Sequence, residues 1–490
     1  MGEKVKKRKH FISTLGTSVY AEGKYISGTS SMRTKFVQQA SLEIGMKDVE
    51  ADAITICLTE CAEKKNWLTR EYTQNDIEME KKSYPDTKIA VGDKYQGLKE
   101  ILEQKYAGRI HTVRMVEGSS QEETDQMFQN LYDIMEENDE IYLDITHGFR
   151  FFPMLAMTVL EYAKVTKNIT VGGIYYGMFG RREPDKEVIE CPLLDLTYYS
   201  DILDWSNAAD SFVRYGNSRQ IRDLMHRLTA QDNFKYRELN KLIQSLNNIT
   251  QCIDVGRGKN GGEKSSANNS IQKAYIQYKK QYEKLDKKDF ANVKPLEVLM
   301  GKIDQKVDVL EVDSNLSTGL SVVKWSLDND MIQQGYTALE ETIKTYACDL
   351  VQMDDTTKLY RDDFAKSIIT RLEKENQGQK ENEKGERERW YQAWLKEMNE
   401  RNSFNMFYND NEEHKQTEQK IKLMGKKLIE IIPYKLVQIS SAVSKKRNDI
   451  NHFGFQKDPV NYEKFKSELE KRYNDLLEII RENPVPTKEE

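Results

Sequence analysis

The first 200 residues alternate short apolar runs with longer amphipathic stretches. In Gln121–Glu137 and Phe152–Lys167, apolar residues recur at three- and four-residue spacing, which predicts helices packed on a sheet. Five further runs have the apolar content of strands: His10–Thr14, Ile54–Leu58, Thr112–Val116, Glu140–Ile145 and Ile169–Tyr175. Because strands that alternate with helices favour a parallel sheet covered on both faces, we predict a Rossmann-like α/β domain here.

The second part of the chain has almost no strand-like run. Asp195–Gly216 carries apolar residues at helical spacing and predicts a helix that leaves the sheet domain. Further helices are predicted over Leu327–Met353, Tyr360–Leu372, Lys420–Ser444 and Tyr462–Glu482. The predicted fold class is α/β plus all-α, with a sheet domain over 1–200, a helical linking region over 201–325 and a helical domain over 326–490.

Two segments lack the apolar residues needed for packing. Asp254–Ser270 is rich in glycine, serine and asparagine, and Glu373–Arg389 is nearly all charged or amide. Both compositions predict surface loops. A lysine- and arginine-containing loop that contacts RNA is the alternative interpretation.

Length and charge exclude several classes of protein. At about 150 residues per domain, 490 residues suggest two to four domains. Lys+Arg 74 against Asp+Glu 80 gives a net charge of −6, so a polybasic nucleic-acid coat is excluded and any nucleic-acid site must be local. The five cysteines show no Cys-x-x-Cys spacing, which indicates reduced thiols in a cytoplasm. Since no apolar run approaches the roughly 18 to 20 residues of a membrane span, we expect neither export nor a membrane partner.

Polar and small residues follow three of the predicted strands, in the loops Ser13–Ser18, Val116–Ser120 and Asp144–Arg150. Open α/β sheets bind ligands at this edge. In the last loop a glycine lets backbone approach a ligand, the following helix offers unpaired N–H groups, and Arg150 adds a positive fork, which together predict an anion site. No Gly-x-Gly-x-x-Gly or Gly-x-x-x-x-Gly-Lys-Ser/Thr motif is present, so ordinary NAD or ATP chemistry is disfavoured.

A simpler interpretation of these loops stays open. Gly16 and Gly148 can be turn glycines, and His147 can be a loop histidine bonded to a neighbouring carbonyl. The complete run Thr146-His147-Gly148-Phe149-Arg150 at a strand end, with a proline opening the next helix, favours the anion site.

The second candidate site is the segment Lys445–Phe453, which follows a predicted apolar helix. Arg447 and His452 are five residues apart, so at about 100° per residue they lie roughly 140° apart around a helix, and one chain cannot easily focus both on one atom. Two such helices across a two-fold axis would bring both pairs into one cleft, which suggests a dimer. The same spacing also arises by chance.

The residue types of this segment suit RNA cleavage. A histidine can deprotonate a 2′-hydroxyl or protonate a leaving oxygen, and an arginine can hold a phosphate as negative charge builds. No cluster of carboxylates has metal-ligand spacing, so we expect a metal-independent reaction.

With both motifs in one chain and in this order, the sequence resembles the CARF–HEPN effector ribonucleases of type III CRISPR systems, in the branch with an Asp-x-Thr-His-Gly-Phe-Arg sensor motif. The matching residues are Leu15-Gly16-Thr17 with Tyr20, Asp144 to Arg150 with Pro153, Trp205 to Ala208 with Phe212 and Gly216, and Arg447 to His452. The resemblance covers 8–216 well and 320–475 by motif and helix pattern, whereas 217–319 is mostly unmatched.

The resemblance implies an antiviral effector in which a Rossmann-like CARF domain binds cyclic oligoadenylate, its allosteric activator, across a homodimer or higher homo-oligomer. A helical HEPN domain would then cleave single-stranded RNA, with no cofactor required. The implied ligand-binding residues are Gly16, Thr17, Ser18, Thr146, His147, Gly148 and Arg150, and the implied catalytic residues are Arg447, Asn448 and His452. Trp67, Tyr176 and Phe179 are candidates to stack on adenines, with core positions as the alternative.

Two other functions stay open. The chain could be a cyclic-nucleotide-sensing regulator that cuts nothing, which would require a basic recognition helix that the sequence does not show. It could also be a HEPN toxin ribonuclease with a passive α/β dimerisation domain, which would make the Thr-His-Gly-Phe-Arg loop accidental.

Overall fold

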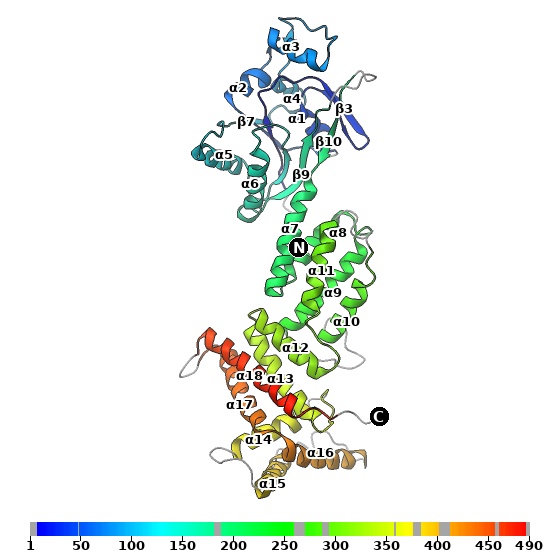
Figure 1. The fold of residues 1–490 in the computed structure, drawn as a ribbon, viewed down its shortest axis with the longest axis vertical. Helices are drawn as coiled ribbons and strands as arrows, with labels where there is room; N and C mark the ends of the chain where they lie inside the picture. Colours follow the sequence, from blue (N-terminus) through cyan, green and yellow to red (C-terminus); the bar gives the residue numbers. More distant parts are fainter. Residues whose placement is uncertain are drawn as a thin grey trace. The chain divides into compact units, whose positions relative to one another are not determined.

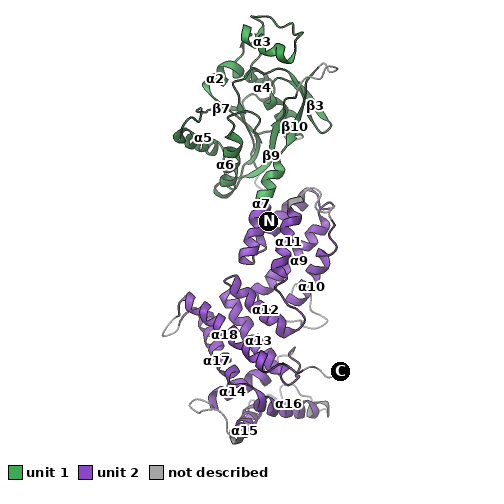
Figure 2. Ribbon diagram, in the orientation of Figure 1, with its two compact units in different colours: residues 1–203 green, residues 204–490 purple. Residues whose placement is uncertain are grey.

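The computed structural model describes residues 7–47, 49–180, 188–258, 270–286, 294–356, 359–375, 384–400, 412–455 and 460–486. The chain divides into two compact units, Met1–Leu203 and Asp204–Glu490 (Figure 2). Helix α7 (Thr197–Tyr215) crosses the division, as the predicted connecting helix does.

The first unit is built on an eight-stranded, mostly parallel sheet with the strand order β3-β2-β10-β9-β8-β1-β4-β7 (Figure 1). The five predicted strands form its parallel part: β1 (Lys9–Leu15), β4 (Ala53–Leu58), β7 (Ile110–Arg114), β8 (Glu140–Asp144) and β9 (Thr170–Gly177). Three strands extend it beyond β9, namely β10 (Glu190–Asp195), β2 (Gly23–Ser27) and β3 (Ser30–Thr34). The predicted fold class is confirmed.

Helices cover both faces of this sheet because successive strand residues point to opposite sides. Phe11 of β1 belongs to the core on one face, and its neighbour Ile12 belongs to the core on the other. The first face packs against α1 (Val37–Ala40), η1 (Ser41–Gly45), α2 (Glu60–Ala62), η2 (Glu63–Trp67) and α4 (Leu98–Tyr106). The second face packs against α5 (Gln121–Asp133) and α6 (Phe152–Thr166), the two predicted helices.

A small layer outside the first face consists of helix α3 (Gln74–Ser83) and a two-stranded ribbon, β5 (Arg70–Glu71) with β6 (Lys94–Tyr95). A capping box begins α3, in which the Thr73 hydroxyl accepts from Asp76 N–H and the Asp76 carboxylate accepts from Thr73 N–H. Arg70 also binds both oxygens of Asp76, so the ribbon and the helix are joined.

The described part of the second unit is helical and has two cores. The first lies among α7, α8 (Arg219–Gln231), α9 (Arg237–Asp254), α10 (Ile271–Tyr282) and α11 (Lys294–Val307). The second involves α13 (Ile332–Asp349), η4 (Leu359–Lys366), α14 (Ser367–Glu375), α15 (Lys384–Glu400), α16 (Glu412–Ile431), α17 (Tyr434–Asn451) and α18 (Tyr462–Glu482). Helix α12 (Asn315–Asp328) contributes Val322 to the first core and Val323 to the second.

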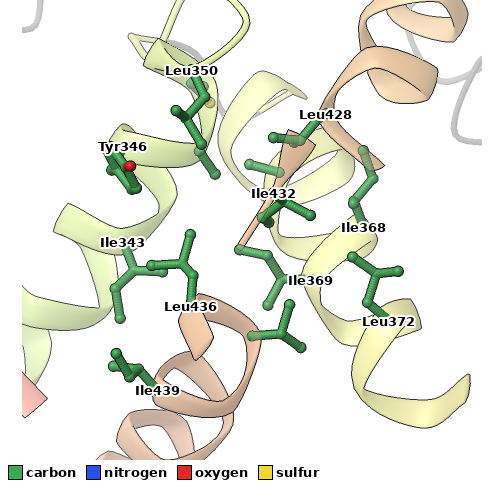
Figure 3. Packing of buried hydrophobic residues seen from close by; sticks show 14 of the residues in the cluster. Ile343, Tyr346, Leu350, Ile368, Ile369, Leu372, Leu428, Ile432, Leu436 and Ile439 are labelled. Carbon is green, nitrogen blue, oxygen red and sulfur yellow. The ribbon is translucent and has the colours of Figure 1, made fainter. Parts of the chain in front are cut away.

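The second core fixes α17 against its neighbours. Figure 3 shows Leu436 and Ile439 of α17 beside Ile343 of α13 and Ile369 of α14. All four side chains are buried, so α17 cannot rotate without exposing them.

The structure corrects two helix predictions and one loop prediction. The predicted helix Lys420–Ser444 is two helices, because Pro433 has no N–H to donate and disfavours helical backbone in the residue before it. Leu327–Met353 joins the end of α12 to α13, with Asp330 in left-handed backbone between them. The predicted loop Glu373–Arg389 is helical at both ends, in α14 and α15, while 376–383 lies outside the described residues.

Of the predicted loop Asp254–Ser270, residues 259–269 lie outside the described part of the chain. Within the described ranges, no helix is both long and apolar enough to cross a bilayer.

Candidate functional site

A buried carboxylate organises the loop after β8. Asp144, the last residue of β8, is fully buried and accepts from the Ser13 hydroxyl of β1 at 2.6 Å and from the Thr146 hydroxyl at 2.5 Å. Burial raises the pKa of Asp144, although the bonds from Ser13 and Thr146 oppose the shift. The Thr146 hydroxyl in turn accepts from Gly177 N–H at 2.8 Å, so this one network joins β1, β8 and β9.

The loop after β1 is held by two buried polar side chains. Asn66 of η2 donates to the carbonyls of both Gly16 and Ser18 at 2.8 Å, and Tyr95 donates to the Asn66 amide oxygen at 2.8 Å. Gly16 N–H donates to the Tyr20 hydroxyl at 2.8 Å. A Cβ at Gly16 would lie 2.8 Å from that hydroxyl, so the glycine is required here by close packing.

His147 lies against the loop from β1. Its ring stacks on Tyr20 with centroids 4.5 Å apart, and its carbonyl accepts from the Thr14 hydroxyl. Burial lowers the pKa of His147 to about 4, so the ring is neutral at physiological pH. Gly148 follows with φ +125°, a backbone conformation that L side chains rarely adopt.

A cavity of about 240 Å³ opens beside these loops. Of the predicted ligand residues, Ser18, Thr146 and His147 line it, whereas Gly16, Thr17, Gly148 and Arg150 do not. Tyr20, Tyr25, Gly177 and Phe179 also line it.

The three aromatic residues that are candidates for stacking on adenines differ in their exposure and in whether they line the cavity. Phe179 lines the cavity and is 43% exposed, which leaves its ring accessible. Tyr176 is exposed outside the cavity lining, whereas Trp67 is 4% exposed within the sheet core. Stacking of Trp67 on a ligand is therefore excluded, and the core alternative holds for that residue.

Three charged residues of the cavity wall, Lys35, Glu80 and Lys82, were not predicted from the sequence. The Lys35 ammonium donates to the Tyr72 hydroxyl and lies 4.7 and 5.2 Å from the ring centroids of Tyr72 and Tyr95. Burial lowers the pKa of Lys35 and raises that of Glu80, which lies on α3. None of the three residues belongs to a motif, so the sequence held no signal for them.

The second candidate site lies at the C-terminal end of α17. Arg447 Nη1 is 3.2 Å from the Glu340 carboxylate of α13, which is almost fully buried. That carboxylate also accepts from the Ser444 hydroxyl at 3.0 Å and from the Lys366 ammonium at 3.4 Å. Glu340 therefore holds the Arg447 guanidinium against α13, and the sequence interpretation did not include it.

Asn448 and His452 are exposed. His452 is the C-cap of α17, where its N–H donates to the Asn448 carbonyl at 2.9 Å. Within the described residues, the His452 ring has no hydrogen-bonding partner, so it is open to a ligand. Arg447 lies in the last turns of α17, beyond the predicted helix end at Ser444, and His452 caps the helix. Arg447 is held in an ion pair, whereas the His452 ring has no partner among the described residues.

Two regions within the first 308 residues match domains of known protein families. Residues 10–180 match the CARF domain of the CRISPR system endoribonuclease Csx1, and residues 201–308 match the second domain of the CRISPR-associated protein MJ1674. MJ1674 of Methanocaldococcus jannaschii is 28% identical over 233 residues, which make up 47% of this chain and 32% of that protein. Neither domain match reaches α17.

Proposed function

We propose that this CRISPR-associated protein, which carries a Csx1-type CARF domain followed by an MJ1674-like second domain, is a ribonuclease activated by cyclic oligoadenylate. The observation that carries the proposal is the pairing of two sites in one chain. A CARF domain with a cavity at the strand ends, lined by both polar and apolar residues, occurs together with an Arg447–His452 pair at a helix end.

The first unit supplies the sensor in this proposal. The loops after β1 and β8 provide Gly16, Thr17, Ser18, Thr146, His147, Gly148 and Arg150 to the phosphates and riboses of the ring. Lys35 adds a cation within the cavity, and Phe179 adds an exposed ring for an adenine. Arg150, which is exposed before α6, would meet a phosphate outside the cavity.

The size of the cavity supports a dimer. Its volume of about 240 Å³ is below the roughly 300–1,000 Å³ of typical small-molecule sites, so it can hold only part of a ring of several adenylates. A second copy related by a two-fold axis would supply a matching cavity for the rest of the ring.

The end of α17 supplies the catalytic residues in this proposal. Arg447 stabilises the negative charge that develops on the scissile phosphate. His452 transfers a proton at the attacking 2′-hydroxyl or the leaving oxygen, and Asn448 orients the phosphate. The RNA chain breaks at the P–O5′ bond as its own 2′-oxygen bonds to phosphorus, which leaves a 2′,3′-cyclic phosphate and a 5′-hydroxyl.

Cleavage of single-stranded RNA by the purified chain, dependent on one of the cyclic oligoadenylates, tests the proposal as a whole. The dimer is tested separately by mixing wild-type chains with an excess of His452→Ala chains. We expect cleavage per wild-type chain to fall, whereas activity that tracks the wild-type chains linearly at full exchange would show self-contained sites.

A further inference from the structure

The turn that follows α17 presents two phenylalanines to solvent. Phe453, which directly follows His452, is 90% exposed, and Phe455, two residues further on, is 88% exposed. The turn is tied to α13, because Gln333 donates to the Asn451 side-chain oxygen at 3.4 Å.

Phe453 occupies a position that usually belongs to glycine. Gly454 N–H donates to the Asp449 carbonyl and Phe453 N–H donates to the Ile450 carbonyl, both at 3.1 Å, which is the Schellman arrangement at a helix C-terminus. The C′ residue of that arrangement takes left-handed backbone, and here it is Phe453, with φ +58°. A bulky side chain is disfavoured in this conformation, so glycine at 453 would make the turn more stable.

Three basic residues lie in the last turns of α17, just before this turn. Lys445, Lys446 and Arg447 precede it, and they pair with Glu373, Glu468 and Glu340, respectively. With a helical rise of 1.5 Å per residue, Phe453 lies roughly 9 Å along the axis from Arg447. About two or three stacked nucleotides span that distance.

We propose that Phe453 and Phe455 form a base-stacking platform for the RNA strand beside the cleaved phosphate. The platform rests on the ribonuclease function proposed above and adds the subsite that grips the bases. Two exposed aromatic rings next to cations are the combination by which proteins bind single-stranded nucleic acid without base-specific hydrogen bonds. The platform therefore favours unpaired RNA and tolerates many sequences.

A second copy of the chain fits these two rings less well. Each phenylalanine can bury about 150–250 Å², so the pair contributes well below the roughly 800 Å² per partner of a stable protein interface. An RNA base, in contrast, can stack on one face of a single phenylalanine ring.

The test compares Phe453→Gly with Phe453→Tyr in the full-length protein. The glycine variant removes the ring and relieves the backbone, whereas the tyrosine variant keeps an aromatic face. Affinity is measured with a short 2′-O-methyl RNA that carries 2-aminopurine, in the presence of each cyclic oligoadenylate, because such RNA binds without being cut. The thermal midpoint and the molar mass in solution are measured on the same samples.

We expect Phe453→Gly to raise the thermal midpoint by a few degrees while weakening RNA binding roughly 5- to 100-fold. Phe453→Tyr should bind like the wild type and quench 2-aminopurine, and Phe455→Leu should weaken binding in the same direction as Phe453→Gly. RNA binding that Phe453→Gly leaves unchanged, or a dimer that it converts to a monomer, would overturn the platform.

The two proposals can fail separately. Phe453-dependent RNA binding without any cleavage would support the platform and contradict the proposed catalysis. Activator-dependent cleavage with the same KM in wild type and Phe453→Gly would support the proposed catalysis and contradict the platform.

Discussion

Glu340 of α13 lies 3.2 Å from the Arg447 guanidinium of α17, and this ion pair draws the partly exposed arginine side chain toward α13. The Glu340 carboxylate is 4% exposed, and it faces two cations, Arg447 and Lys366. Glu340 is thus a positioning residue in the proposed reaction, because it acts through Arg447.

Replacement of Glu340 by glutamine should lower kcat for RNA cleavage roughly 10- to 100-fold while KM changes little. The amide keeps the shape but no longer attracts the guanidinium, so the arginine loses its fixed direction. Lys366→Gln is the matched control, because Lys366 contacts the other carboxylate oxygen at 3.4 Å and is 45% exposed. Equal losses of kcat in both variants, or a Glu340→Gln enzyme as fast as wild type, would remove Glu340 from this role.

Two substitutions of Asp144 should show whether the shape or the charge of its side chain stabilises the loop after β8. Asp144→Ala removes the carboxylate to which the Ser13 and Thr146 hydroxyls donate and should cost roughly 2 to 4 kcal/mol of unfolding free energy. Asp144→Asn should cost less than about 1 kcal/mol, because the Ser13 hydroxyl can donate to the Thr14 carbonyl, 3.3 Å away, and accept from the amide. Urea unfolding of the three proteins measures both values, and similar losses for alanine and asparagine would contradict the network.

The low pKa of His147 predicts how stability depends on pH. The folded ring takes up a proton only near pH 4, whereas the unfolded ring does so near its usual value of about 6.5. Since the unfolded chain binds more protons between these values, the contribution of His147 to stability is complete above about pH 6.5 and falls as pH drops toward 4. Unfolding free energy should therefore fall by roughly 1 to 3 kcal/mol across this window.

His147→Gln should flatten that slope. His10, whose pKa burial also lowers, is present in both proteins and contributes equally to each curve. A slope that the substitution leaves unchanged would show that His147 is not buried in its neutral form. Activator affinity should also stay constant from about pH 6 to 8, because a neutral ring has no charge to lose.

Lys35→Met should weaken binding of the activating cyclic oligoadenylate roughly 10- to 100-fold, because a partly desolvated ammonium is lost from the cavity wall. Lys99→Gln is the control, since Lys99 pairs with Glu103 on α4 away from the cavity. Titration calorimetry gives both affinities. An unchanged affinity for Lys35→Met would place the phosphates elsewhere.

The sequence predicts the centre of the sheet better than its edge. Strands β1, β4 and β8 are almost entirely buried, and each carries adjacent apolar residues that mark it as a strand covered on both faces. Strand β3 is mostly exposed and reads SSMRT, which has no such pattern. The helix break at Pro433 was visible in the sequence, because proline cannot donate the helical hydrogen bond.

The candidate sites likewise contain some residues that a local sequence pattern marks and others that it does not. Thr146, His147 and Arg447 could be named as candidates from the sequence because they lie in short motifs. Lys35, Glu80 and Glu340 were missed because tertiary packing alone brings them to their sites: the β2–β3 hairpin leads into Lys35, α3 carries Glu80, and α13 carries Glu340. No local pattern marks a residue whose partner is distant in the sequence.

In the proposed function, activator binding switches on RNA cleavage by the end of α17. The most direct measurement is the initial rate of cleavage of a single-stranded RNA, with and without each cyclic oligoadenylate, by the wild type and by His452→Ala. The account predicts activator-dependent cleavage that leaves a 2′,3′-cyclic phosphate, a rate about 10² to 10⁴ lower for His452→Ala, and no cleavage at a 2′-deoxy position. Full activity of His452→Ala, or cleavage at the deoxy position, would contradict it.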